Sequence, residues 1–134
     1  MKKDIIYTEV TDVAVCIVKE WNEQEEVIWN VYLLNLKGED IENVFVSSKG
    51  YGFINGEEVK TSLLRHSIGN MPALTFSKVE PIMEDVFLIT NEFWVSFYQN
   101  NELFDKKFIF LPETIKEDYL IQIPVIFKKG VMIQ

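Results

Sequence analysis

Cysteine and histidine are almost absent from the chain, which has one of each in 134 residues. The single cysteine, Cys16, cannot form a disulfide within the chain, so the fold does not depend on an oxidising compartment. One cysteine and one histidine also exclude a zinc site built from those ligands. Cys16 stands in the apolar run 13–18 without a basic neighbour. We therefore expect a buried residue and not a reactive thiol.

Long hydrophobic runs are absent as well. No stretch approaches the roughly 18 consecutive apolar residues of a membrane span. Near the N-terminus three apolar residues follow Asp4, whereas a secretory signal needs about seven or more. The chain contains no internal repeat, no low-complexity tract and no Pro/Ser-rich linker. These features predict one domain over residues 1–134, a cytoplasmic location and no membrane partner.

Positive charge is scarce, because 13 Lys and Arg residues face 21 Asp and Glu residues, a net charge of −8. A charge of this sign repels phosphate backbones, so nucleic acid is not the expected partner. Glycine-rich phosphate loops and the His-Glu-x-x-His and Gly-x-Ser-x-Gly motifs are missing too. The carboxylates fall almost entirely in predicted turns, where they are usually solvated. The sequence therefore predicts no catalytic residue, no cofactor and no metal, and an enzyme is not the expected function.

Short apolar runs with a period of two, separated by polar turns, fill the chain and predict an all-β fold. In residues 12–20 the side chains of Val13, Val15 and Ile17 share one face. Turn signals recur about every ten residues. This rhythm predicts a single-domain β-sandwich of about seven strands, with an immunoglobulin-like arrangement as the first choice.

Two local sequence features predict where a strand ends and where a short helix lies. A strand near 73–80 should stop at Pro81, because proline cannot donate to a strand ladder. Thr114 and Glu117 have the spacing of a capping box, so one short helical segment is expected over 113–120, near the C-terminus.

The clearest predicted element is a hairpin of residues 92–99 and 103–111. Asn100-Asn101 forms a two-residue turn, so the numbers of paired residues sum to 201. The expected pairs are Phe97 with Phe104, Phe93 with Phe108, and Trp94 with Lys107. A slip by one residue would turn the aromatic side chains outward, so the register is fixed.

Aromatic residues are in surplus and lie on both faces of two strands. Trp29 and Tyr32 should point to opposite sides of one strand, as should Trp94 and its neighbours on another. In a sandwich one face of each sheet is buried and the other normally meets water. Either residues 112–124 cover the outer faces, or a second chain does. Trp29, Tyr32, Trp94 and Tyr98 are therefore the predicted interaction surface of a non-enzymatic module that binds a protein partner or itself as a homodimer.

A first alternative is single-stranded nucleic-acid binding by the strand 49–54. Its sequence Lys-Gly-Tyr-Gly-Phe-Ile is similar to the octamer motif of RNA-recognition and cold-shock domains. That similarity implies base stacking on Tyr51 and Phe53, with Lys49 at the phosphates. Only twelve residues separate this strand from the hexamer-like segment 31–36, too few for the helix and strand found there in RNA-recognition domains. We therefore interpret the motif as fortuitous and expect Tyr51 and Phe53 to pack on the core.

A second alternative is a ligand-binding or enzymatic pocket near His66. A histidine that acts as an acid or base needs an orienting carboxylate and a nucleophile, and no sequence neighbour of His66 identifies either. A concave site in which His66 meets a carboxylate would favour this alternative.

The chain as a whole resembles a known group of proteins, and three stretches make the resemblance recognisable. They are Val-Ser-Ser-Lys-Gly-Tyr-Gly from Val46, Phe-Trp-Val-Ser-Phe-Tyr from Phe93, and Lys-Lys-Phe-Ile-Phe-Leu-Pro from Lys106. In these the chain resembles a family of short uncharacterised bacterial proteins, some of which carry a phenylalanyl-tRNA synthetase label. The resemblance implies no known activity. The chain is too short for that enzyme's catalytic domain and lacks an ATP-binding motif.

Overall fold

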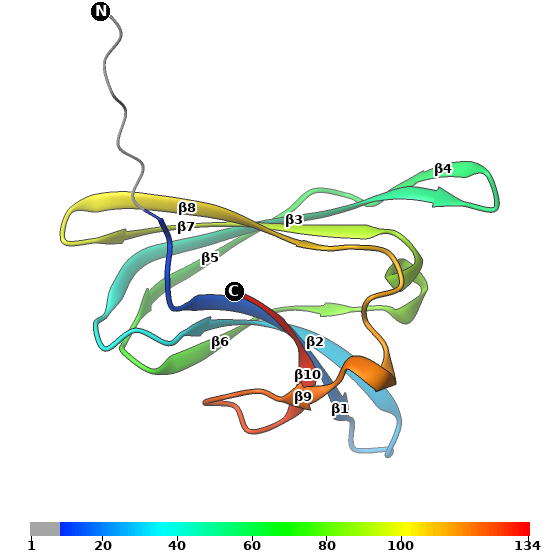
Figure 1. The fold of residues 1–134 in the computed structure, drawn as a ribbon, viewed down its shortest axis with the longest axis horizontal. Coiled ribbons are helices and arrows are strands. Elements are labelled where there is room, and N and C mark those ends of the chain that lie inside the picture. The colour runs from blue at the N-terminus through cyan, green and yellow to red at the C-terminus, as the bar shows by residue number, and fades with distance from the viewer. Residues whose placement is uncertain (1–8) are drawn as a thin grey trace, which may run out of the picture.

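The computed structural model describes residues 9–134, which form two antiparallel β-sheets packed face to face (Figure 1). The first sheet has the order β6-β2-β1-β10-β9, with the bounds β1 Val13–Trp21, β2 Val27–Asn35, β6 Thr75–Ile82, β9 Ile121–Gln122 and β10 Lys129–Ile133. The second has the order β4-β3-β7-β8, with β5 also paired to β3, and the bounds β3 Ile41–Ile54, β4 Glu57–Lys60, β5 Leu64–Met71, β7 Thr90–Gln99 and β8 Glu102–Phe110. The predicted all-β, single-domain sandwich is confirmed. The N-terminal stretch examined for a secretory signal lies outside the described residues.

The core lies between the two sheets because alternate residues of each strand point inward. Val13, Val15 and Ile17 all face it, as their shared parity predicts. The second sheet contributes four almost fully buried phenylalanines, among them Phe93 and Phe108, together with five aliphatic or methionine side chains. Aromatic rings therefore fill much of the space between the layers.

The hairpin of β7 and β8 has the predicted register. Phe97 lies opposite Phe104, with ring centroids 5.4 Å apart and nearly parallel planes. On the other face the Lys107 ammonium lies 4.7 Å from the ring centre of Trp94, its cross-strand partner. Both turn residues, at 100 and 101, have positive φ, as a tight two-residue turn of this hand requires. The hairpin prediction is confirmed.

A second hairpin, formed by the end of β3 and by β4, projects beyond the body of the sandwich (Figure 1). Its turn is Asn55-Gly56, and both residues have positive φ (52° and 79°). These two residue types adopt that conformation at low cost, which explains why the chain reverses here. The projecting strands carry side chains away from the core.

Two expectations about element ends were wrong. β6 does not stop at Pro81 but runs through it to Ile82. This is tolerated because β6 is an edge strand that pairs only with β2. The helical segment is shorter than predicted, a single 3₁₀ turn at Glu117–Tyr119, and Thr114 donates to the Leu111 carbonyl and caps nothing.

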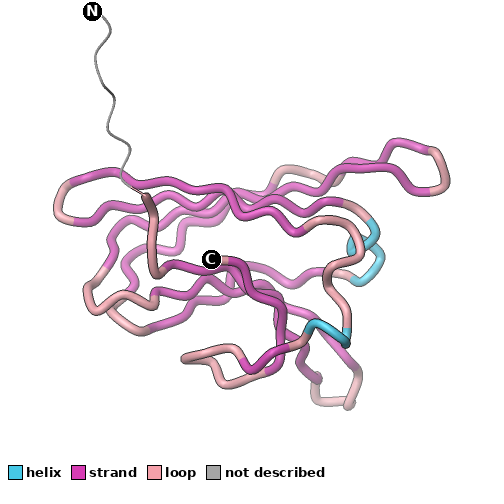
Figure 2. The backbone as a smooth tube through the Cα atoms, in the orientation of Figure 1, coloured by secondary structure: helices cyan, strands magenta, loops and turns pink. Residues whose placement is uncertain are grey.

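A second 3₁₀ turn, η1 (Glu84–Leu88), follows β6 and was not predicted. Figure 2 shows both helical turns at one end of the sandwich, where the chain passes between the sheets. Residues 9–134 contain ten strands where about seven were expected. Two strands, β4 and β5, replace the single strand expected after the Asn55-Gly56 turn, and the two-residue strand β9 was not expected.

Candidate functional site

The outer face of the first sheet is covered by the chain's own C-terminal segment. Ile123 is fully buried against Cys16 and Tyr32, and Ile126 packs beside them. Glu20 of β1 holds this segment in place. Its carboxylate accepts a hydrogen bond from the Tyr32 hydroxyl at 2.7 Å and forms an ion pair with Lys128 of the segment at 2.5 Å. We call this surface over β1 and β2 the covered face.

Two residues of the predicted interaction surface are therefore buried within the chain. Trp29 faces the core and is 7% exposed, with its indole nitrogen bonded to Glu84. Tyr32 lies on the opposite side of the same strand, as expected, but under Ile123 at 9% exposure. Trp29 and Tyr32 were wrong as surface residues, because Trp29 points into the core and the expected alternative cover, residues 112–124, places Ile123 over Tyr32. Trp94 and Tyr98 remain available.

The outer face of the second sheet is open. Trp94 and Tyr98 of β7 are 44% and 41% exposed, and Phe45 of β3 lies beside them. β8 adds Leu103 opposite Tyr98, and Ile109 further along the strand. Residues paired across strands point to the same side of a sheet. These five residues therefore form one apolar surface, which we call the open face.

Charged side chains border the open face without giving it a net sign. The register places basic and acidic residues on this side in equal number: Lys49, Lys60, Arg65 and Lys107, and Glu42, Glu58, Glu92 and Asp105. The surplus of negative charge in the chain thus lies elsewhere. Lys107 rests on the Trp94 ring, where a cation–π contact stabilises both.

The edges of both sheets carry features that discourage strand pairing. Charged side chains or a proline occupy every long edge, and β9 is too short to offer a ladder: Arg65 on β5, Lys78 and Pro81 on β6, Glu57 and Glu58 on β4, and Asp105 and Lys106 on β8. Such residues prevent edge-to-edge association. Strand pairing of another chain with these edges is therefore disfavoured.

The motif strand at the end of β3 does not pack on the core, so that expectation was wrong. Phe53 is 69% exposed on the projecting hairpin. Tyr51 is half-buried, and its hydroxyl donates to Glu92 at 3.2 Å. Lys49 lies over the Tyr51 ring, at 5.7 Å from its centre. A groove of about 530 Å³ runs along these residues.

The lysines of this groove are paired with carboxylates. The Lys49 ammonium lies 3.7 Å from Glu92, and the Lys60 ammonium lies 3.1 Å from Glu58. The groove therefore offers aromatic rings without free positive charge. Burial and the hydrogen bond to Glu92 raise the pKa of the Tyr51 phenol, so this group stays neutral at physiological pH.

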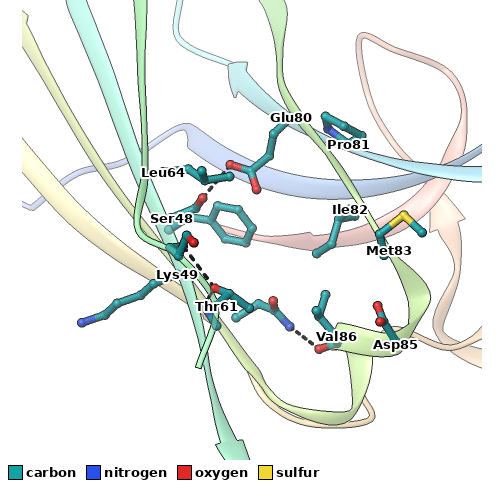
Figure 3. Close-up of a pocket in the computed structure, with 14 residues that line it drawn as sticks. Ser48, Lys49, Thr61, Leu64, Glu80, Pro81, Ile82, Met83, Asp85 and Val86 are labelled. Carbon is teal, nitrogen blue, oxygen red and sulfur yellow. Dashed lines mark hydrogen bonds between the residues drawn. The ribbon is translucent and has the colours of Figure 1, made fainter. Parts of the chain in front are cut away.

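His66 does meet a carboxylate, which the sequence did not show. Its Nε2 lies 2.8 Å from Oε1 of Glu80, and the same oxygen accepts the Ser48 hydroxyl at 2.6 Å. These three residues come from β5, β6 and β3, so they tie the two sheets together along one edge. Beside them lies a pocket of about 320 Å³, lined by Ser48, Glu80 and residues of η1 (Figure 3).

The arrangement is not that of an activated serine. In a hydrolase triad the histidine accepts the proton of the nucleophile. Here the Ser48 hydroxyl donates to Glu80 instead, and its side chain is almost fully buried. The cluster can hold a negative charge at a fixed position, which suits binding better than nucleophilic catalysis.

Over residues 9–134 no group of three or more His, Cys, Asp or Glu side chains is placed to hold a metal ion. No helix within that range is long and apolar enough to cross a membrane. Comparison of the chain with protein-family models, curated proteins and solved structures gave no match.

Proposed function

We propose that the protein is a non-enzymatic interaction module that binds protein through its open face, and that the partner is a second copy of the chain. The observation that carries this proposal is the contrast between the outer faces. The covered face is sealed by Ile123, whereas Trp94 and Tyr98 remain more than 40% exposed. Exposed aromatic clusters of this kind are characteristic of binding surfaces, in which Trp and Tyr contribute most of the energy.

The charge distribution supports a second copy as the partner. In a two-fold interface the same surface contacts itself, so a face of one sign would be repelled. The open face carries both signs, and Asp105 and Lys107 alternate along β8, so a basic group of one copy can meet an acidic group of the other. The guarded edges direct the contact to the face.

Single-strand nucleic-acid binding is the second candidate, favoured by the exposure of Phe53 beside Tyr51. Two rings could stack on two bases, each worth about 1–3 kcal/mol. Tight binding needs free positive charge for the phosphates. Lys49 and Lys60 are already neutralised by Glu92 and Glu58, so this candidate ranks below protein binding.

The proposal includes an immunoglobulin-like arrangement and a cytoplasmic location. The order β6-β2-β1 in one sheet against β5-β3-β7-β8 in the other supports the first. The single buried thiol, Cys16, supports the second, since the fold uses no disulfide. The resemblance to short bacterial proteins remains a prediction and assigns no activity.

Sedimentation velocity between about 1 and 200 μM tests the proposal. We expect the mass to rise from 15.7 kDa toward twice that value with concentration. The double variant Trp94→Ser, Tyr98→Ser should stay monomeric. The matched control Trp21→Ser, Phe127→Ser removes two exposed aromatic residues away from the open face and should dimerise like the unmodified chain. A monomer throughout the range would refute self-association, and equal effects of the two variants would refute the assignment of the face.

A further inference from the structure

The intersheet pocket beside Glu80 has the size of a small-ligand site, and none of the five apolar residues of the open face lines it. Its volume of about 320 Å³ lies at the lower end of the usual range for such sites. Ser48 of β3 lies on one side, and Ile82 with Val86 of η1 lies on the other (Figure 3); Gly50 of β3 also lines the pocket. Ile82 and Phe93 give it an apolar interior. A ligand of a few carbon atoms fits such a space.

Glu80 presents an unused carboxylate oxygen to this pocket. Both of its polar contacts, from Ser48 and His66, fall on Oε1. Among the described residues Oε2 has no hydrogen-bond partner. In Figure 3 the Glu80 side chain reaches over the pocket, with one carboxylate oxygen turned to Ser48 and the other turned inward. The side chain is only 12% exposed, so the negative charge is held in place.

Asn91 adds a second acceptor, and it is 95% buried. Its amide nitrogen donates to the carbonyls of Val86 at 2.8 Å and Ile89 at 3.2 Å. Two carbonyl partners fix the orientation of the amide, because only the nitrogen can donate. Its Oδ1 therefore faces the other way, toward the wall at Gly50, and accepts no hydrogen bond within residues 9–134. No buried side-chain nitrogen or oxygen among the described residues lacks a partner. This Oδ1 is therefore accessible, and because Asn91 lines the pocket it can accept a hydrogen bond from a ligand.

Two of the three hydroxyl groups that line the pocket, those of Ser48 and Thr61 but not Ser62, already donate within the chain. Ser48 donates to Glu80, and Thr61 donates to the Ser62 carbonyl. Lys49 lines the wall through its backbone side, and its side chain points away from the pocket (Figure 3). Asp85 adds a carboxylate at the exposed end of the pocket. The site thus offers acceptors and negative charge, and its ligand has to bring N–H donors and positive charge.

We propose that this pocket binds the ammonium group of a primary alkylamine, either a free small amine or a lysine side chain. Glu80 Oε2 and Asn91 Oδ1 accept two of the three ammonium protons. The alkyl chain lies along Ile82 and Phe93. The role of His66 and Ser48 is to position the Glu80 carboxylate. This site is separate from the open face, so amine binding and self-association can be tested independently of each other.

Titration of the full chain with n-butylamine at pH 7, followed by ¹⁵N–¹H NMR, tests the proposal. We expect saturable shifts of amides at 48–50 and 80–91. The neutral alcohol n-butanol, which has the same shape, should produce at least tenfold weaker binding, and butyrate should produce none. Nα-acetyl-lysine methylamide distinguishes the two sources: saturation at similar concentration indicates a lysine side chain, and much weaker saturation indicates a free amine.

Substitutions assign the site. Glu80→Gln should weaken butylamine binding at least tenfold. Glu92→Gln removes another buried carboxylate, which faces the hairpin groove, and should leave the affinity unchanged. Asp85→Asn alters an exposed residue of the pocket without affecting the core and should weaken butylamine binding several-fold. This variant tests the site if the Glu80→Gln variant does not fold. Equal binding of amine and alcohol, or an unchanged affinity in both Glu80→Gln and Asp85→Asn, would overturn the proposal.

Discussion

The outer faces of the two sheets carry similar aromatic residues but differ in their exposure to solvent. β2 and β7 both carry large aromatic side chains on the outside, Tyr32 in one and Trp94 in the other. Tyr32 is 9% exposed because Ile123 and the loop after it lie on top of it, whereas Trp94 is 44% exposed. The covered face is thus packed within the chain, whereas the open face remains exposed.

The difference also shows in the polar groups around the two faces. On the covered face Glu20 is a shared acceptor for Tyr32, Asn30 and Lys128. On the open face Asp105 and Lys107 lie between Leu103 and Ile109 on β8, and Lys107 contacts a ring and no carboxylate within the described residues. A closed hydrogen-bond network stabilises a fold, whereas charged groups without such a network suit a surface that exchanges solvent for a partner.

The largest expected effect comes from the same substitution on each face. Ile123→Ala should lower the free energy of unfolding by about 2–4 kcal/mol, because it empties a fully buried site. Ile109→Ala, at a residue that is 39% exposed, should cost less than about 1 kcal/mol. Urea denaturation of both variants measures the difference. Similar losses would show that the two faces are not distinct. Ile109→Ala should also weaken self-association, which Ile123→Ala should not.

Cys16 reports opening of the covered face. Burial, with a smaller contribution from the charge of Glu20, raises the pKa of its thiol to about 12, so the native thiol should react very slowly with iodoacetamide at pH 8. Ile123→Ala should speed the reaction at least about tenfold, since about 1.4 kcal/mol of lost stability gives ten times more open form. Mass spectrometry follows the reaction. Ile109→Ala is the control, and an equal acceleration there would contradict the account.

Glu20 should give the covered face a pH dependence. Burial acts to raise the pKa of this carboxyl, but hydrogen bonds from Lys128, Tyr32 and Asn30 outweigh it and hold the pKa below the ordinary 4.5. The resulting stabilisation is complete above pH 4.5 and is lost as the pH falls through the lowered pKa. Glu20→Gln should therefore cost about 1–2 kcal/mol at pH 7. Urea midpoints at pH 7 and pH 3 should converge for the two proteins, and a constant difference would exclude this role.

The smallest expected effect is on nucleic acid. Mixed-sequence labelled oligonucleotides should show no saturable binding below tens of micromolar at about 0.15 M salt. The double variant Tyr51→Ala, Phe53→Ala should behave identically. Saturable binding that this variant abolishes would make the projecting hairpin, and not the open face, the functional surface.

The sequence was sufficient for what depends on local periodicity. Alternation set the inward face of β1, and Asn100-Asn101 set the register that brings Phe97 to Phe104. It was insufficient where segments distant in the chain meet. Ile123 lies on Tyr32, 91 positions apart, and no local pattern specifies such a contact.

The same limit applies to the pocket. Glu80, His66 and Ser48 come from three strands and converge only because β5 and β6 lie at matching edges of opposite sheets. The one available signal was Glu80 itself, a carboxylate next to a proline at the end of an alternating strand. Strict alternation would place Glu80 on the same outward side as Lys78. A register shift between β2 and β6 after residue 31 instead pairs Glu80 with Val31, so its side chain points inward.

The three tryptophans allow the most direct test of the contrast between the faces. Trp94 lies on the open face, Trp29 in the core, and Trp21, 58% exposed, at the end of β1 away from the open face. With 5-fluorotryptophan incorporated, ¹⁹F NMR gives one resonance for each. On raising the concentration from about 10 to 500 μM, the account predicts that the Trp94 resonance shifts or broadens while those of Trp21 and Trp29 do not. A constant Trp94 resonance, or a change at Trp21 instead, would contradict it.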